Sequence, residues 1–388
     1  MKASDPGRAL HVFMVCPWAL PNIGGVESHL EKLLQALVPR GYSVTLVTYQ
    51  PLTSRVRGDP IERRPGVTIY RLPWFGQGWF PTLEQLPFPL VFAWLFPGLC
   101  LGAAWIYWRE RRRVDVLHAH GFIAAAVAKV LNGLRRRRTV ISTHAIYHLA
   151  ERRALRALLR WLLGTADRII CVGSPSMHEL EHAGLPRTKM ALLKNWVDIE
   201  RFRPRDRGAA RQALGYTGFT VLFAGRLIAK KGIPVLLESA RELPDVQFHF
   251  LGDGPEAATL KRAAVTQPNV QFRGRVSDED LVRAYEAADV FVQLALYEEG
   301  QAAVFLESIA CGTPVIASAR GCARDYLDPS VATLIEPTTD ALIRALRHLS
   351  THPEELRSRQ AQCRPYAEQR YSARNVDVFT DSYDASFS

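Results

Sequence analysis

Short apolar runs alternate with helix-like segments along this chain, and that alternation constrains its fold more than any other feature. It favours parallel sheets wound in βαβ units. The expected strands are residues 10–16, 43–48, 67–71, 114–117, 139–142, 168–172 and 190–193 in the first half, and 219–224, 246–251, 270–273, 290–293, 314–317 and 333–335 in the second. Since each set is enough for its own sheet, we expect an α/β protein with two doubly wound domains facing each other across a cleft. Ligands of such folds bind beyond the carboxyl ends of the strands.

The length of the chain, 388 residues, exceeds one ordinary core and suits two domains of roughly 180 residues each. Residues 198–216 are rich in Arg, Pro and Gly and form the natural linker. The six cysteines show no CxxC pair and no even spacing, which indicates reduced cytosolic thiols rather than a disulfide framework or a zinc ribbon. The apolar run 10–16 is short and precedes a Gly-Gly turn, so we interpret it as a first strand rather than a secretion signal.

The net charge of +11 is unevenly distributed. Residues 1–200 hold 26 Lys and Arg against 14 Asp and Glu, whereas the remainder holds 23 against 24. Most of the surplus lies in arginine clusters at 109–113, 135–138 and 152–160. No nucleic-acid-binding motif accompanies them, so nucleic acid is not an expected partner. Because the clusters adjoin apolar stretches, an anionic membrane surface is the favoured partner.

Two segments of the first half suggest where a membrane would be contacted. Residues 85–108 carry no charge and approach the length of a membrane span. They lie between two strands of one predicted sheet, so a single crossing is rejected; a core-packed helix and a segment dipping into the membrane interface remain open. Residues 151–163 form a basic amphipathic helix, which an ordinary surface helix would also explain. The candidate membrane contacts are Trp94, Trp105, Trp108, Arg111, Arg112, Arg113, Arg152, Arg156 and Arg160.

Two carboxylates eight positions apart, Glu299 and Glu307, bracket a Gly-Gln-Ala-Ala stretch that leads into an apolar helix. If that stretch opens the helix, its free N–H groups and positive dipole end form an anion site between the carboxylates. A diphosphate flanked by hydroxyl-bearing sugars would fit. On spacing alone, a loop charge at Glu299 and a solvated helix residue at Glu307 are the favoured explanation.

Cations and glycines follow several predicted strands. Arg226 and Lys231 lie after residues 219–224 and could neutralise a diphosphate leaving group without a metal. Gly24 and Gly25 let a ligand approach the start of a helix. The turn containing Gly252 and Gly254 partly imitates a dinucleotide fingerprint but lacks its third glycine, and is weak evidence for NAD.

Several histidines cluster after two neighbouring strands. His118 and His120 end one strand with both rings on one face, and His144 follows the next strand. No acidic or thiolate residue joins them at metal spacing, so no metal is expected. We expect His120 to contact substrate and leave open whether His118 is buried.

In chain order, Gly24-Gly25, His120, Arg226 with Lys231-Gly232, Gly252-Asp253-Gly254, and Glu299 with Glu307 resemble glycosyltransferase family 4 (group 1). The resemblance covers nearly the whole chain. It implies a retaining, nucleotide-sugar-dependent enzyme of the GT-B fold, with two Rossmann-like domains and no obligatory metal or cofactor. It further implies an acceptor-binding domain at 1–198, a nucleotide-sugar-binding domain at 199–365, and a C-terminal helix within 366–388 that returns to the first domain.

The resemblance also assigns roles by position. The implied catalytic residues are His120, Arg226, Lys231 and Glu299. The implied donor-binding residues are Gly24, Gly25, Gly225, Arg226, Lys231, Gly252, Gly254, Gly274, Glu299, Ala302, Ala303, Val304 and Glu307, with Glu27 and His144 on the acceptor side. One departure stands out: many members have Gly-Phe-Gly-Leu after the first glutamate, whereas this chain has Gly300-Gln301-Ala302-Ala303. The added β-carbon at Ala302 narrows the approach to the sugar-phosphate.

The sequence thus predicts transfer of a sugar from a UDP- or GDP-sugar to an acceptor hydroxyl, with a lipid or lipid-linked saccharide at the inner membrane surface as acceptor. Cell-envelope glycan or glycolipid synthesis at the cytoplasmic face of the membrane is the expected setting. An NAD-dependent oxidoreductase, a soluble enzyme of the same fold and a catalytically silent partner subunit remain alternatives.

Overall fold

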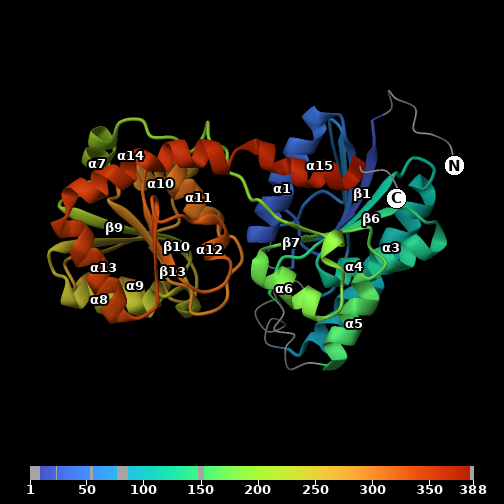
Figure 1. Ribbon diagram of the computed structural model, residues 1–388, viewed down its shortest axis with the longest axis horizontal. Coiled ribbons are helices and arrows are strands. Elements are labelled where there is room, and N and C mark those ends of the chain that lie inside the picture. The colour runs from blue at the N-terminus through green and yellow to red at the C-terminus, as the bar shows by residue number, and fades with distance from the viewer. Residues whose placement is uncertain (1–8, 23, 53–55, 77–85, 147–152, 385–388) are drawn as a thin grey trace. The chain divides into compact units, whose positions relative to one another are not determined.

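The computed structural model describes residues 9–22, 24–52, 56–76, 86–146 and 153–384. These residues form two compact units (Figure 1). Unit 1 comprises the described residues up to Leu193 together with those from Val376 onward, and unit 2 comprises Lys194–Asn375. The chain therefore passes between the units twice.

The described residues of unit 1 form an eight-stranded sheet in the order β3-β4-β2-β1-β5-β6-β7-β8. Its strands are β1 (His11–Val15), β2 (Ser43–Tyr49), β3 (Ile61–Arg64), β4 (Val67–Leu72), β5 (Val116–His120), β6 (Arg138–Ser142), β7 (Arg168–Cys171) and β8 (Met190–Leu192). All neighbours pair in parallel except β3, which is antiparallel to β4. Every strand expected in the first half is present, with ends shifted by a few residues. The exposed edge strand β3 was not expected.

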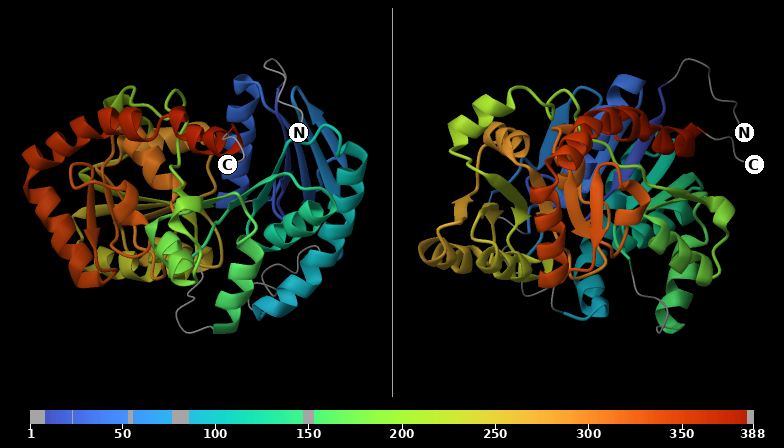
Figure 2. Two further views of the ribbon diagram at one scale, coloured as in Figure 1. Left: turned by 45° about the vertical axis from the view of Figure 1, so that its right-hand side comes forward. Right: turned by 60° about the vertical axis from the view of Figure 1, so that its left-hand side comes forward.

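Helices cover both faces of this sheet, as buried parallel strands require. They are α1 (Gly25–Leu37), α3 (Phe88–Glu110), α4 (Phe122–Leu134), α5 (Arg153–Leu163), α6 (Ser174–His182) and α15 (Asp377–Asp384). Leu117 and Ala119 of β5 face a core built with α3, α4, α5 and α6. His118 and His120, which alternate with them, face α1 and α15. Both views in Figure 2 show α15 (red) beside α1 (blue).

The long apolar helix α3 has two different sides. Leu95, Leu99 and Ala103 are fully buried in the core of unit 1, whereas Leu101 and Trp105 are exposed. Among the described helices, Pro89–Glu110 meets the length and apolarity of a membrane span, which is weak evidence by itself. It connects β4 to β5, and both belong to one sheet. The buried side therefore packs as a core helix, and the other side is left on the surface.

Unit 2 forms a six-stranded parallel sheet in the order β11-β10-β9-β12-β13-β14. Its strands are β9 (Phe219–Arg226), β10 (Val246–Asp253), β11 (Val270–Gly274), β12 (Val290–Gln293), β13 (Val315–Ser318) and β14 (Ala332–Ile335). Its helices are α7 (Arg207–Leu214), α8 (Ile233–Glu242), α9 (Ala257–Thr266), α10 (Asp278–Ala287), α11 (Ala303–Ala310), α12 (Ala323–Tyr326), α13 (Thr339–Thr351) and α14 (Pro353–Arg370). Separate cores lie on the two faces of the sheet. The strands expected in the second half are all present.

Candidate active site

The order of the strands in unit 2 reverses direction at β9, which makes its carboxyl end the topological switch point of the sheet. The chain leaves β9 toward β10 on one side, while β12 lies on the other side, and such a reversal is where ligands of doubly wound folds bind. Arg226 ends β9, Gln293 ends β12 and Ser318 ends β13. The side chain of Arg226 is exposed there.

Glu299 is held by a network of polar side chains. It lies in the loop between β12 and α11. Lys231 Nζ donates to its Oε1 at 2.8 Å, Gln293 Nε2 donates to its Oε2 at 2.8 Å, and the Tyr297 hydroxyl donates to Oε1 at 3.1 Å. The Lys231 and Glu299 side chains are only 17% and 18% exposed. The predicted diphosphate-binding cation and the predicted sugar-binding carboxylate thus neutralise each other in the structure.

Glu307 lies on α11, about one turn after its start, and accepts a hydrogen bond from the Tyr285 hydroxyl at 3.1 Å. Burial raises the pKa of Tyr285 well above its usual value, and the nearby Glu307 carboxylate adds to the rise. Tyr285 therefore remains a hydrogen-bond donor and fixes one carboxylate oxygen. The other oxygen of Glu307 is not committed to Tyr285.

The helix α11 begins at Ala303, with Ala302 at the preceding position. The amides of Ala303 and Val304 thus belong to the first turn, whose N–H groups have no partner within a helix. The Ala302 N–H donates to the Tyr326 hydroxyl at 3.1 Å. The Ala302 amide, which was predicted to bind phosphate, is therefore already paired with Tyr326.

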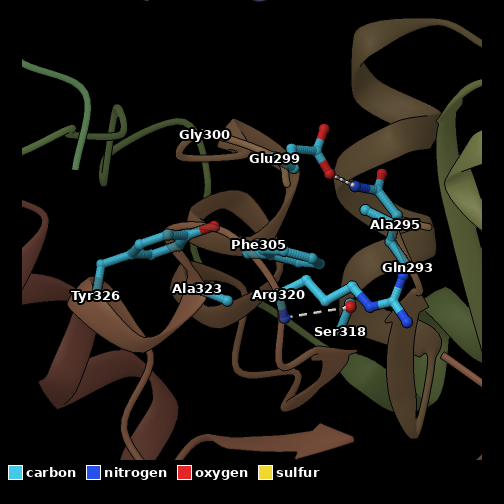
Figure 3. A pocket seen from close by; sticks show the side chains of 9 residues that line it. All are labelled: Gln293, Ala295, Glu299, Gly300, Phe305, Ser318, Arg320, Ala323 and Tyr326. Carbon is cyan, nitrogen blue, oxygen red and sulfur yellow. Dashed lines mark hydrogen bonds between the residues drawn. The ribbon is translucent and has the colours of Figure 1, made fainter. Parts of the chain in front are cut away.

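An open pocket of about 210 Å³ adjoins this network, and Figure 3 shows Tyr326, Phe305 and Arg320 around it. Its lining residues are Gln293, Ala295, Glu299, Gly300, Phe305, Ser318, Arg320, Ala323 and Tyr326. Gly321, with φ of 66°, lets the segment after β13 pack directly on the Glu299 backbone. The Cys322 N–H donates to the Glu299 carbonyl oxygen at 2.9 Å, so the backbone that carries this carboxylate is fixed.

The predicted glycines of unit 2 lie at or beside the same strand ends. Gly225 is in β9, Gly252 in β10 and Gly274 ends β11, while Gly254 follows β10. Gly252 has φ of 131°, and a β-carbon there would overlap the carbonyl oxygen of Gly225. This glycine is therefore required for the close approach of the ends of the paired strands β9 and β10.

Unit 1 contributes a separate cluster of four imidazoles. His118 and His120 end β5, His29 lies on α1, and His144 follows β6. The rings of His118 and His120 are 4.0 Å apart, and those of His120 and His144 are stacked at 5.3 Å. His118 and His120 are 1% and 2% exposed. Burial lowers the pKa of both well below the usual value, and it lowers the pKa of His144 to about 3.

The two ring nitrogens of His120 have different surroundings. Its Nδ1 is 3.1 Å from His144 Nε2, so one of these rings donates to the other. Its Nε2 is buried and has no hydrogen-bond partner among the described residues. An unpaired buried nitrogen is costly, and a ligand that hydrogen-bonds to it would remove that cost.

The start of α1 lies beside this cluster. Gly24 precedes α1 in an extended conformation and Gly25 begins it. Glu27 is 7% exposed, and burial raises the pKa of its carboxyl group. A side chain at Gly24 would meet the Glu27 carboxylate, so the glycine makes room for it. Glu27 lies on the same helix as His29, and the His144 ring lies 5.7 Å from the His29 ring.

The predicted membrane contacts comprise two exposed tryptophans, one half-buried tryptophan and a set of arginines. Trp105 and Trp108 are 58% and 62% exposed on α3. The guanidinium of Arg109 lies 4.8 Å from the Trp105 ring, and that of Arg111 lies 4.6 Å from the Trp108 ring. Trp94 is half-buried and packs against the core, with its ring against Phe75, so it does not belong to the exposed side.

The predicted basic contacts lie on α5 or directly after α3. Arg112 and Arg113 follow α3 and are exposed, while Arg156 and Arg160 lie on α5. Arg152 lies outside the described residues. Because α3 packs on α4 and α4 packs on α5, these residues belong to one layer of helices.

Within the described ranges, no group of three or more His, Cys, Asp or Glu side chains is placed to hold a metal ion. Gln293, Tyr297, Tyr285 and Tyr326 are site residues that the sequence reasoning missed. Gln293 carried a usable signal, since it is a polar residue at the end of an otherwise apolar strand. Tyr285 and Tyr326 carried none, because they reach Glu307 and Ala302 through the fold, whereas Tyr297 lies two residues before Glu299 in the chain.

Comparison with solved structures defines the class of this protein. Sucrose-phosphate synthase from Thermosynechococcus elongatus superposes with a TM-score of 0.79 at 21% identity and covers 96% of this chain and 97% of its own. An Anabaena protein solved in complex with UDP superposes with a TM-score of 0.75 at 19% identity, covering 96% and 98%. These neighbours have the GT-B fold of glycosyltransferases, and the expected pair of Rossmann-like α/β domains is confirmed.

Comparison of sequences then assigns the family. The model described as Glycosyltransferase Family 4 matches residues 23–201, and that described as Glycosyl transferases group 1 matches residues 206–370. This chain therefore belongs to the group 1 glycosyltransferases of family 4 and is a glycosyltransferase. An NAD-dependent oxidoreductase is not its class.

Two relatives illustrate the likeness. One subunit of the phosphatidylinositol N-acetylglucosaminyltransferase of Arabidopsis thaliana is 25% identical over 367 residues, which cover 90% of this chain and 77% of the relative. A GDP-mannose-dependent monoacylated alpha-(1-6)-phosphatidylinositol monomannoside mannosyltransferase of Corynebacterium glutamicum is 33% identical over 197 residues, which cover 46% of this chain and 52% of the relative.

Proposed function

We propose that this protein transfers a sugar from a nucleoside diphosphate sugar to a hydroxyl of a lipid or lipid-linked saccharide, with retention of anomeric configuration. The single observation that carries the proposal is the Lys231–Glu299 pair beside the first turn of α11, with Glu307 further along that helix. The pair supports the proposal because a cation, a carboxylate and the first-turn amides of α11 follow the ends of the adjacent strands β9 and β12. The names of the two relatives support an inositol lipid as the kind of acceptor.

In this proposal unit 2 binds the donor. Lys231 and Arg226 bind the diphosphate together with the amides of Ala303 and Val304. Glu307 accepts hydrogen bonds from the ribose hydroxyls, and Glu299 accepts them from the donor sugar. Because Lys231 already contacts Glu299, a donor that bridges them is positioned at both its phosphate and its sugar. The solved neighbour with UDP supports a nucleoside diphosphate as ligand, while the base remains to be determined.

The chemical step follows from charge. The acceptor oxygen forms a bond to the anomeric carbon as the bond from that carbon to the diphosphate oxygen breaks. The acceptor proton passes to the departing diphosphate, which leaves on the same face. Lys231, Arg226 and the helix amides stabilise the negative charge that develops on the leaving group. No protein carboxylate has to act as an acid or base.

Unit 1 provides the acceptor side in this proposal. His120 offers the unpaired Nε2 to the sugar beside the reacting carbon, and Glu27 and His144 bind the acceptor. The histidines are neutral near pH 7, so they orient hydroxyl groups rather than neutralise phosphate.

We further propose that the exposed side of α3 and the outer faces of α4 and α5 rest on the cytoplasmic face of an anionic membrane. Trp105 and Trp108, together with Trp161 at 61% exposure on α5, would lie at the interface. Lys129 Nζ lies 4.1 Å from the Trp161 ring, so three tryptophans in this layer each have a cation over the ring. Tryptophan with an adjacent cation suits the headgroup region of anionic lipids.

Flotation with anionic liposomes tests the membrane contact. The double variant Trp105→Ala/Trp108→Ala should float less than the parent protein at low salt. Val265→Ala, which removes an 85%-exposed apolar side chain from α9 of unit 2, is the matched control and should float like the parent. Equal flotation of all three proteins would contradict this docking surface.

A thermal-shift screen of UDP-, GDP- and ADP-sugars, followed by a nucleotide-release assay with the stabilising donor and inositol lipid acceptors, tests the reaction. Stabilisation by one nucleotide class and acceptor-dependent release are expected. Donor binding without release would instead favour a catalytically silent partner subunit.

A further inference from the structure

The helix α15 encloses the histidine cluster of unit 1. Phe379 and Tyr383, one helical turn apart, both point at the imidazoles and are 0% and 3% exposed. The Phe379 ring lies 5.7 Å from His29 and 5.8 Å from His118. The Tyr383 hydroxyl lies 2.7 Å from His118 Nδ1, a contact between residues 265 positions apart.

The helix is anchored to unit 1 along its length. Arg40 pairs with Asp377 at 3.6 Å near its start, and the Tyr42 hydroxyl donates to Asp384 at 2.6 Å at its end. Arg138 Nε donates to the Ser382 carbonyl oxygen at 2.6 Å. Tyr383 is therefore presented to His118 by a fixed element.

These contacts hold both ring nitrogens of His118. Its Nε2 lies 2.8 Å from Ser142 Oγ, and its Nδ1 lies 2.7 Å from the Tyr383 hydroxyl. The buried ring is neutral, and a neutral imidazole has one donor and one acceptor nitrogen. One of the two hydroxyls therefore donates to the ring and the other accepts from it, so the tautomer of His118 depends on both contacts.

A held His118 constrains His120. The two side chains lie on the same face of β5 with rings 4.0 Å apart. On its other side His120 stacks on His144, so its ring is confined between two imidazoles. A rotation of the His118 ring would remove one of the two ring surfaces that hold His120.

We propose that Tyr383 is a positioning residue. It locks the orientation and tautomer of His118, and through the ring contact it aims the unpaired Nε2 of His120 at the ligand. This role rests on the proposed function of His120 in glycosyl transfer. It assigns to α15 a part in the chemistry of unit 1 beyond covering its core.

The test compares two full-length variants that each remove one hydroxyl from the contacts of α15. Tyr383→Phe removes the contact with His118, whereas Tyr42→Phe removes the contact with Asp384 and touches no histidine nitrogen. Nitrogen NMR of the imidazoles reports the tautomers directly. Tyr383→Phe should change the tautomer equilibrium of His118 and shift the His120 signals. Tyr42→Phe should leave both as in the parent.

Kinetics provide the second readout. Tyr383→Phe should lower kcat about tenfold and leave the affinity for donor unchanged, because the donor site lies in unit 2 and small displacements of a reacting group act on kcat. Unchanged His118 and His120 signals, or a fall in kcat no larger than in Tyr42→Phe, would overturn the proposal. If the parent protein shows no transfer, the spectra still decide whether Tyr383 sets the state of His118 and His120.

A second variant covers the case in which Tyr383→Phe does not fold. Ser142→Ala removes the partner of His118 Nε2 and keeps Tyr383 in place. It should perturb the His120 signals and lower kcat in the same way. His120 signals identical to the parent would overturn the proposal.

Discussion

The two candidate sites of this protein are built on opposite electrostatic principles. In unit 2, Lys231 and Glu299 form an ion pair that is partly open to solvent, with side chains 17% and 18% exposed. In unit 1, His118 and His120 are buried, and burial keeps them neutral. Charge is therefore concentrated where a diphosphate would bind. Neutral hydrogen-bonding groups are concentrated where an uncharged hydroxyl or sugar would bind.

The comparison teaches how the proposed transfer divides its tasks between the two units. Stabilising a leaving group requires positive charge, and unit 2 supplies it at the end of β9. Orienting a hydroxyl requires fixed donors and acceptors without net charge, which the imidazoles supply. Substitutions in the two sites should therefore fail in different ways.

Loss of the cation in unit 2 should have the largest effect. Lys231→Ala removes a charge that faces the leaving group and leaves Glu299 without its ion-pair partner. We expect kcat/KM to fall about 10²- to 10³-fold, the range seen when one charge-stabilising donor is removed. Lys230→Ala, an exposed neighbour, is the matched control and should be nearly silent. A similar fall in kcat/KM in both variants would contradict a specific role of Lys231 in stabilising the leaving group.

Loss of the second carboxylate should act mainly on donor binding. Glu307→Ala removes the proposed ribose acceptor and leaves the Tyr285 hydroxyl unpaired. A hydrogen bond to a charged group corresponds to about 1.5–3 kcal/mol, so the donor Kd should rise about tenfold to 100-fold. Calorimetric titration with the nucleotide measures this. The same Kd as in the control Glu298→Ala, whose side chain is exposed, would contradict the ribose role.

Acid should destabilise unit 1 through its histidines. His144 has a pKa of about 3 when folded, against about 6.5 when unfolded. Between these two pH values the unfolded state therefore binds a proton at His144 that the folded state does not bind. This contribution to stability is present above pH 6.5 and is lost as the pH falls toward 3. At pH 5.5 the loss from His144 is about 1 kcal/mol.

Urea unfolding at pH 7.0 and pH 5.5, followed in the parent and in His144→Gln, measures that loss. The variant should lose less stability on acidification than the parent. An equal loss in both proteins would show that His144 is not held neutral.

The smallest effect is expected at the start of α11. Tyr326→Phe removes the acceptor of the Ala302 N–H and keeps the aromatic ring in the pocket. We expect about a threefold change in donor Kd, because one neutral hydrogen bond contributes roughly 0.5–1.5 kcal/mol. Tyr107→Phe, whose hydroxyl donates to the Arg135 carbonyl oxygen in unit 1, is the control. Equal donor Kd values in the two variants would contradict a role of Tyr326 at the anion site.

Much of the fold could be predicted because buried parallel strands are short, apolar and bounded by turns. β1, β5 and β6 are buried throughout and were all expected. β3 was missed because its sequence, Ile-Glu-Arg-Arg, is charged. It pairs in antiparallel fashion with β4 and lies at the edge of the sheet, where charged residues remain solvated.

The site was predictable only where its residues lie close in sequence to a strand end. Glu299 and Lys231 could each be singled out, but their direct ion pair spans 68 positions and has no sequence signature. The same holds for Tyr326 and Ala302. His120 could be assigned to a strand end, whereas the enclosure by α15 depends on a segment far along the chain.

The placement of α15 also has a consequence for biosynthesis. Phe379 and Tyr383 leave the ribosome only after Lys194–Asn375 has been made, yet they complete the surroundings of His29 and His118. The earlier part of unit 1 is therefore without α15, and its imidazoles are not covered by that helix, until unit 2 has been synthesised. Domains generally fold as units during synthesis. A chain that ends at residue 375 should therefore contain all of unit 2 and a unit 1 that lacks the cover of α15.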